Sequence, residues 1–188
     1  MIDKKDARRE IKFVGPLSSF YFIESWLKTS FGHFRQHFPD RYIRSVYFDS
    51  SNLDSYESNI AGISKRMKLR YRWYGKEISP QQGKLEVKRR INSLGWKSII
   101  ETDYPVNLDN SGILNLSNNC ISSLGISFYD LYKFYSIPIA TIGYKRKYFI
   151  SRDGNIRATI DSNQFYIRQF GKSEYSLDKQ RFDRENII

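Results

Sequence analysis

Four cationic side chains occupy every second position in residues 65–74, which read KRMKLRYRWY. They are Arg66, Lys68, Arg70 and Arg72. Ammonium and guanidinium groups bind phosphate oxygens, and the planar fork of arginine matches a phosphate group in a way that a point charge cannot. A row of such groups is suited to holding a polyanion.

The same spacing predicts the element that carries these cations. Successive side chains of a strand point to opposite faces, whereas a helix would spread the cations around its circumference. Neighbouring cations on one face of a strand stand about 7 Å apart and repel each other by roughly 2 kcal/mol at an effective dielectric constant of about 20. Two interpretations follow: a solvated basic face, or a face that lines a polyanion site.

The alternation of cations with apolar or aromatic residues recurs along the chain. It is seen in residues 8–14, 84–91, 95–104, 140–151 and 155–162. If helices cover the apolar sides of these predicted strands, the basic sides must meet one another. A closed or nearly closed sheet would place the cations inside a tunnel. Small barrels usually fill their interior with apolar side chains, so a charged interior requires a bound anion and water.

The remaining pattern predicts an α+β fold. Residues 17–34 have helical spacing and form an apolar stripe of Phe20, Ile23, Trp26 and Leu27, which indicates a core-facing helix. Further strands are predicted at residues 42–50 and 164–171, and short helices at residues 51–60 and 107–136. The order of these elements favours an antiparallel sheet with flanking helices in a single domain of residues 1–188. The converging basic faces predict that this sheet forms a β-tunnel, a closed or nearly closed barrel.

The composition of the chain indicates the class of partner and the cellular compartment. Thirty-one Lys and Arg residues against 20 Asp and Glu residues leave a formal net charge of +11, which predicts a polyanionic partner. Cys120 is the only cysteine, so an internal disulfide is excluded and a reducing compartment is expected. The charged start MIDKKDARRE does not resemble a secretory leader, and no apolar run is long enough to span a bilayer. A cytoplasmic location is therefore predicted.

Three other sets of residues give weaker signals. His33 and His37 are four residues apart, but no acidic or cysteine partner lies near them in sequence, so surface or helix-end positions are favoured. Cys120 has the character of a small structural residue. Asp161 shares a predicted strand face with Arg157, where it could form an ion pair or serve a metal, and the ion pair is favoured.

Several strings occur in this order along the chain: REIKF, IRSVYFDSSNLDSYESNIAG, KRMKLRYRWYG, LEVKRR, WKS, YKRKYF and IRATID. Together they resemble the VTC-type polyphosphate polymerase domain, a relative of the CYTH or triphosphate tunnel proteins. The resemblance extends from Arg9 to about Asp161. It implies an antiparallel tunnel that holds ATP, inorganic polyphosphate or triphosphate, together with a divalent metal, Mn²⁺ or Mg²⁺.

Carried over by position, the resemblance implies a set of phosphate-binding residues. They are Lys12, Arg66, Lys68, Arg70, Arg72, Lys88, Lys97, Arg146 and Arg157. Arg70, Arg72 and Lys88 are implied to act in catalysis, in which a terminal phosphate of the growing chain attacks the γ-phosphate of ATP. Glu10 and Glu86 are the candidate metal ligands, although ion pairing with the surrounding cations is the favoured role for each.

The chain departs from the family pattern at two places. The Glu-x-Glu-x-Lys start of CYTH-type hydrolases is reduced here, because position 8 is Arg and only Glu10 and Lys12 match. The final Glu-x-Lys strand is expected to be missing. A module that binds polyphosphate or triphosphate without catalysis, or a triphosphatase, therefore stays open as an alternative. Nucleic acid binding is disfavoured because the aromatic residues alternate onto the faces opposite the cations.

Overall fold

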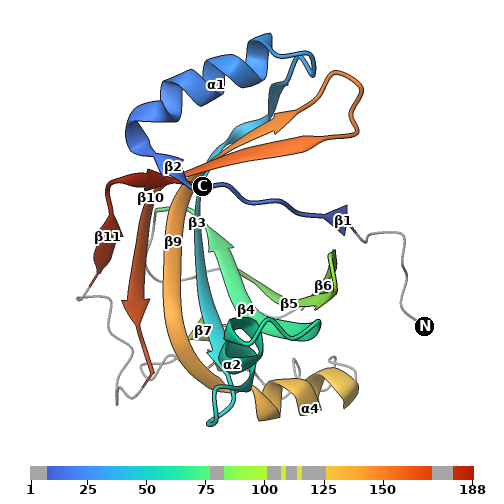
Figure 1. Ribbon diagram of the computed structural model, residues 1–188. Coiled ribbons are helices and arrows are strands. Elements are labelled where there is room, and N and C mark those ends of the chain that lie inside the picture. Colours follow the sequence, from blue (N-terminus) through green and yellow to red (C-terminus); the bar gives the residue numbers. More distant parts are fainter. Residues whose placement is uncertain (1–7, 77–82, 101–106, 109–113, 116–125, 171–179) are drawn as a thin grey trace.

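The computed structural model describes residues 8–76, 83–100, 107–108, 114–115, 126–170 and 180–188. One antiparallel sheet of eight strands dominates these residues (Figure 1). In spatial order its strands are β1 (Arg8–Arg9), β6 (Leu94–Ile100), β5 (Gly83–Ile91), β4 (Lys65–Tyr74), β3 (Arg35–Asp49), β9 (Ile137–Ile150), β10 (Arg157–Arg168) and β11 (Arg181–Asp183). The predicted α+β class, an antiparallel sheet with flanking helices, is confirmed.

The other elements are short. The two small strand pairs are β2 (Gly15–Pro16) with β12 (Asn186–Ile187), and β7 (Asn107–Leu108) with β8 (Leu114–Asn115). The helices are η2 (Leu17–Ser19), α1 (Phe20–Thr29), α2 (Asp54–Ile60) and α4 (Ile126–Phe134). None of these described helices is long and apolar enough to cross a membrane.

The main core lies on one face of the central strands. Its buried residues are Val46, Phe48, Leu69, Tyr71, Trp73, Leu85, Val87 and Tyr132. Those on β4 and β5 are the odd-numbered positions between the cations, as the alternation predicts. Tyr132 comes from α4, so this helix covers the apolar face of the sheet.

Helix α1 packs on the outer ends of β9 and β10. Leu27 is buried with Phe149 and Ile160, and Phe20 and Ile23 pack against this cluster. Trp26 was predicted for the same stripe, and that prediction is wrong because its side chain is 56% exposed. Only a narrow stripe of the helix packs against the sheet, so the side chain of Trp26 faces solvent.

Some predicted element boundaries are wrong. Strand β3 begins at Arg35, seven residues before the prediction, because long-range pairing with β9 extends it. Residues 155–162 and 164–171 were expected as separate strands, but β10 runs through both with an irregularity between Ser162 and Phe165. Residues 8–14 are not one strand, since only β1 pairs there. The predicted turn at Asp153 and Gly154 is present, and Gly154 has a φ of +78°.

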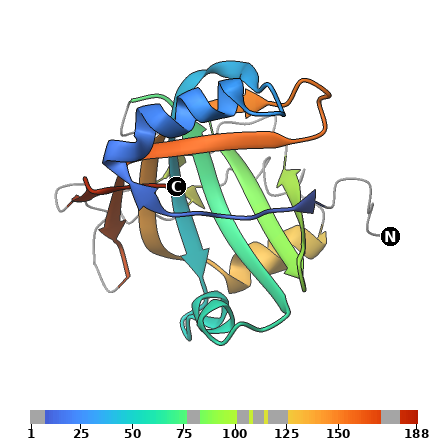
Figure 2. The same cartoon turned by 45° about the horizontal axis from the view of Figure 1, so that its top comes forward.

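The barrel was predicted to be closed or nearly closed, and strand pairing does not close it. No ladder joins the edge strands β1 and β11 among the residues that the structure describes, because both edges are very short. Instead, the segment 10–14 runs between β1, paired with β6, and β2, paired with β12 (Figure 2). Ile188 also exchanges two backbone hydrogen bonds with Asp161 of β10. The N-terminal segment therefore connects the two ends of the sheet.

Candidate functional site

The face of the sheet opposite the main core is here called the basic face. It comprises the even-numbered residues of β4 and β5 with their cross-strand partners on β3 and β6. The pairing continues this face onto β9 and β10 through Tyr144, Arg146 and Asp161. The structure thus brings most of the predicted cations together: Lys68, Arg70, Arg72, Lys88, Lys97 and Arg146.

Glu86 is the buried centre of this face, with 1% of its surface exposed. Its Oε2 atom lies 2.8 Å from Nε and 2.6 Å from Nη2 of Arg70. Lys97 donates to its Oε1 atom at 3.1 Å, and Arg72 Nη1 lies 3.8 Å from Oε2. Burial raises the pKa of Glu86, but the charges of Arg70, Arg72 and Lys97 outweigh this and lower it below its ordinary value.

Two tyrosines and a serine orient the arginines. Arg70 donates from Nη1 to the hydroxyl of Tyr47 at 3.1 Å. Arg72 donates from Nε to Ser45 Oγ at 3.2 Å and from Nη2 to the hydroxyl of Tyr144 at 3.3 Å. Ser45 and Tyr144 lie on β3 and β9, so the side chain of Arg72 reaches across two strands. Fixed guanidinium groups of this kind are preorganised to bind an oxyanion.

Three lysines stand in a row on adjacent strands. Lys68 on β4 is directly opposite Lys88 on β5, which is directly opposite Lys97 on β6. Lys88 donates to Glu10 at 2.7 Å. This contact places residues 10–14, here called the crossing segment, over the basic face. Lys68 makes no ion pair within the described residues. Burial lowers the pKa of Lys68, and the positive charges of Lys12 and Lys88 lower it further.

Arg146 forms a bidentate ion pair on this face. Its Nε and Nη2 atoms donate to the two carboxylate oxygens of Asp161, each at 2.6 Å. The expected ion pair of Asp161 with one of the predicted cations is therefore confirmed, and that cation is Arg146. Burial by itself lowers the pKa of Arg146, but the hydrogen bonds and charge of Asp161 raise it above its ordinary value.

Three of the predicted cations lie at the margins. Lys12 is exposed on the crossing segment, 3.9 Å from Glu10, and does not lie on a strand. Arg66 is half-buried at the start of β4 and donates to the carbonyl oxygen of Ile63 at 3.0 Å. Arg157 is exposed at the start of β10, four residues before Asp161. The structure brings none of these three into contact with Glu86.

The described carboxylates do not fit a metal site held by protein atoms. Glu86 is engaged by three cations, and Glu10 pairs with Lys88 and Lys12. No group of three or more His, Cys, Asp or Glu residues suitable for a metal occurs in the described part of the chain. His33 is exposed after α1, and His37 is half-buried on β3. Cys120 lies outside the described residues.

Three further cations of the basic face were not among the candidate ligands. Arg41 lies on β3, directly opposite Arg146. Lys84 and Arg90 lie on β5, directly opposite Arg72 and Arg66. The alternation of residues 84–90 could have identified Lys84, because it continues the series of Glu86 and Lys88. No local signal identifies Arg41, because only the pairing of β3 with β9 places it on this face.

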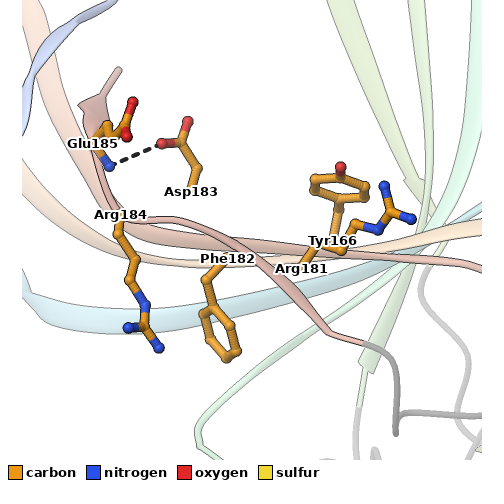
Figure 3. Close-up of a pocket in the computed structure, with 6 residues that line it drawn as sticks. All are labelled: Tyr166, Arg181, Phe182, Asp183, Arg184 and Glu185. Atoms are coloured by element: carbon orange, nitrogen blue, oxygen red, sulfur yellow. Dashed lines mark hydrogen bonds between the residues drawn. The ribbon is translucent and has the colours of Figure 1, made fainter.

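The pocket shown in Figure 3 lies elsewhere. Its lining consists of Tyr166, Arg181, Phe182, Asp183, Arg184 and Glu185, on β10, on β11 and just after β11. None of the predicted site residues lines it. A hollow at the sheet edge therefore does not mark the cation cluster.

The family model for the VTC domain matches residues 7–187. This chain belongs to the VTC domain family. The match of the VTC domain includes every described element of the basic face and the C-terminal strands β11 and β12. These strands read RFD and NI, so neither carries the Glu-x-Lys pattern expected of a last strand.

One solved structure that matches is described as a candidate adenylyl cyclase, HpAC1 from Hippeastrum, with a dominant triphosphatase activity. It is 12% identical, with a TM-score of 0.40, and the match covers 96% of the VTC domain chain and 74% of the other chain. The search of curated proteins finds no match.

Proposed function

We propose that the basic face of this VTC domain binds the phosphate chain of ATP, inorganic polyphosphate or triphosphate and transfers a terminal phosphoryl group. The observation that carries the proposal is the row of Lys68, Lys88 and Lys97 on three adjacent strands. Like charges directly opposite one another destabilise a sheet. A bound chain of linked phosphates would supply the missing negative charge along this row.

In this proposal the curved sheet and the crossing segment 10–14 enclose the phosphate chain as a tunnel. The ion pair between Glu10 and Lys88 supports this arrangement, because it holds the segment over the row of lysines. The pairing of β2 with β12 fixes the other end of the segment. Exclusion of bulk water under the segment would strengthen each contact between a cation and a phosphate.

The proposed catalytic residues are Arg70, Arg72 and Lys88, with the remaining predicted cations as phosphate ligands. An oxygen of the terminal phosphate of the growing chain forms a bond to the γ-phosphorus of ATP. The bond from that phosphorus to the bridging oxygen breaks, and ADP leaves with the electron pair. The two arginines are fixed by Glu86, Tyr47, Ser45 and Tyr144, so they can offset the developing charge without reorganising.

The carboxylates of the basic face do not supply a metal site in this proposal. Glu10, Glu86 and Asp161 are each engaged by cations. Mg²⁺ or Mn²⁺ is expected here only as a counterion that arrives on the phosphate oxygens of the nucleotide.

The engaged carboxylates favour a second candidate function, a polyphosphate- or triphosphate-binding module without catalysis. A site that pairs its acidic groups with its own arginines can bind an anion tightly while leaving no free carboxylate for further chemistry. Glu86 and Asp161 are in this condition among the described residues.

Incubation of the purified protein with ATP and Mn²⁺ or Mg²⁺ separates these functions. Growth of the polyphosphate chain indicates the polymerase, phosphate release without growth indicates a triphosphatase, and tight binding without turnover indicates the binding module. Arg70→Ala and Arg72→Ala are expected to weaken binding of tripolyphosphate, whereas Lys65→Ala, on the same strand but the other face, is not. The proposal fails if wild-type protein binds none of these compounds, or if RNA displaces tripolyphosphate at equal charge concentration.

A further inference from the structure

Arg41 is a cation of the basic face that no predicted role uses. It lies on β3 directly opposite Arg146 on β9, and its side chain is exposed. Side chains in such positions have Cβ atoms about 4.5–5.5 Å apart, so two like charges there repel. Arg146 is neutralised by Asp161, but this carboxylate already uses both oxygens on Arg146.

Three aromatic rings surround the guanidinium of Arg41. Its Cζ atom lies 5.2 Å from the ring centre of Phe38, 5.5 Å from that of Tyr74 and 5.8 Å from that of Tyr148. Phe38 and Tyr148 also contact each other edge to face. Ring faces attract a cation, so these residues hold the guanidinium in place. Among the described residues, no acceptor bonds to its N–H donors.

Arg41 differs in this respect from the arginines at the centre of the face. Arg70 and Arg72 contact Glu86, and Arg146 contacts Asp161. Within the residues that the structure describes, Arg41 has neither a carboxylate nor a hydrogen-bond acceptor. An arginine that is positioned by aromatic rings and lies opposite another arginine is suited to bind an anion.

We propose that Arg41 forms an outer phosphate subsite of the basic face. This inference rests on the proposed function, because it takes the same linked phosphates as the ligand. Arg72 contacts Tyr144, the residue two positions before Arg146 on β9, so the cations run continuously from β4 to Arg41. The subsite binds one phosphate group of a chain that extends beyond the central arginines. Its recognition is by charge and the planar fork of the guanidinium, so it does not require a nucleobase.

The test compares Arg41→Gln with Arg44→Gln in calorimetric binding of long-chain polyphosphate and of ATP. Arg44 is the matched control, because it lies on the same strand and its guanidinium also faces a ring, that of Phe165 at 5.6 Å, on the opposite face. Arg41→Gln is expected to weaken binding of long-chain polyphosphate about tenfold, the effect of losing one charge-assisted hydrogen bond. Arg44→Gln is expected to leave it within about twofold of wild type.

Arg41→Lys is the control for an effect on folding alone. It keeps the charge and loses the fork, and is expected to bind more tightly than Arg41→Gln while melting at the same temperature as wild type. Unchanged affinity of Arg41→Gln for long-chain polyphosphate overturns the subsite. Weaker binding of ATP alone also overturns it, because the rings would then be stacking a nucleobase. If wild-type protein binds no polyphosphate, the proposed function fails and the subsite fails with it.

Discussion

Glu86 lies directly opposite Arg70 in the ladder of β4 and β5, and one of its oxygens accepts from two nitrogens of that guanidinium. Arg72 and Lys97 also lie within 4 Å of this carboxylate. Three cations therefore share one buried anion. This cluster stabilises the fold through its ion pairs and at the same time leaves excess positive charge for a ligand.

Glu86→Gln is expected to lower the free energy of unfolding by about 3–5 kcal/mol, the typical effect of removing one partner from a buried ion pair. The loss follows because Arg70 and Arg72 stay buried without a negative charge. Urea denaturation followed by tryptophan fluorescence measures the difference. Glu185→Gln removes the same charge from an exposed position and is expected to change stability by less than about 0.5 kcal/mol. Equal effects of the two substitutions would contradict the role assigned to Glu86.

The same carboxylate predicts a loss of stability in acid. The folded-state pKa of Glu86 is lowered from its ordinary value of 4.5. Its contribution is therefore fully present above about pH 4.5, and it disappears as the pH falls through the lower, folded-state pKa. The difference in unfolding free energy between wild type and Glu86→Gln should shrink over that range. A difference that stays constant from neutral pH down to pH 2 would show that the charge of Glu86 is not involved.

Lys68→Gln is expected to weaken binding of tripolyphosphate about tenfold, because it removes from the row of lysines a cation that has no ion pair with any residue the structure describes. The same substitution is expected to increase the free energy of unfolding, not to decrease it. The pKa of Lys68 is lowered from 10.5, so the folded state disfavours its charged form. The stability of wild type should therefore rise relative to Lys68→Gln as the pH increases through the folded-state pKa towards 10.5.

Lys65→Gln is the control for Lys68→Gln. It removes one charge from the same strand at an odd-numbered, exposed position. Calorimetric titration of both variants separates a specific contact from an effect of net charge. If the two variants lose affinity equally, the row of lysines is not the binding surface.

Glu10→Gln is expected to tighten binding of polyphosphate. Glu10 occupies Lys88 at 2.7 Å as an internal anion, and a phosphate chain must compete with it. Both side chains are partly exposed, so the pair contributes at most about 1 kcal/mol, and the gain should be about two- to fivefold in affinity. The exposed Glu57→Gln on α2 serves as the matched loss of charge. Weaker binding by Glu10→Gln would instead indicate that the crossing segment needs this pair to stay in place.

Gly83→Ala tests the packing under the basic face. A Cβ atom at Gly83 would lie 2.3 Å from Cζ of Tyr71, and the side chain of Tyr71 is fully buried. The expected loss is about 1–3 kcal/mol of unfolding free energy, the usual effect of overpacking a core. Gly15→Ala is the control, because nothing lies within 4 Å of its added Cβ. Thermal unfolding of the two variants checks this, and an unchanged Gly83→Ala would show that β5 is free to shift.

Much of the central site could be predicted from local sequence. The alternation in residues 65–74 and 84–91 correctly assigns β4 and β5, their antiparallel pairing, and the side on which Arg70, Arg72 and Lys88 lie. This works because successive residues of a strand point to opposite faces, so the polarity of each face can be read from alternate positions in the sequence. The helix at α2 and the turn at Asp153 follow from equally local signals.

Other features depended on contacts between distant segments. Period-two alternation determined by itself that the chain has one apolar and one cationic side per strand, and that a polyanion suits the cationic side. Only the tertiary structure decided that Arg146 pairs with Asp161 and that Glu86 contacts three cations. It also placed Arg41 on the basic face and the segment 10–14 across it. The physical reason is that a side-chain face is set by adjacent residues, whereas cross-strand register and ion pairs are set by the packing of strands far apart in the chain.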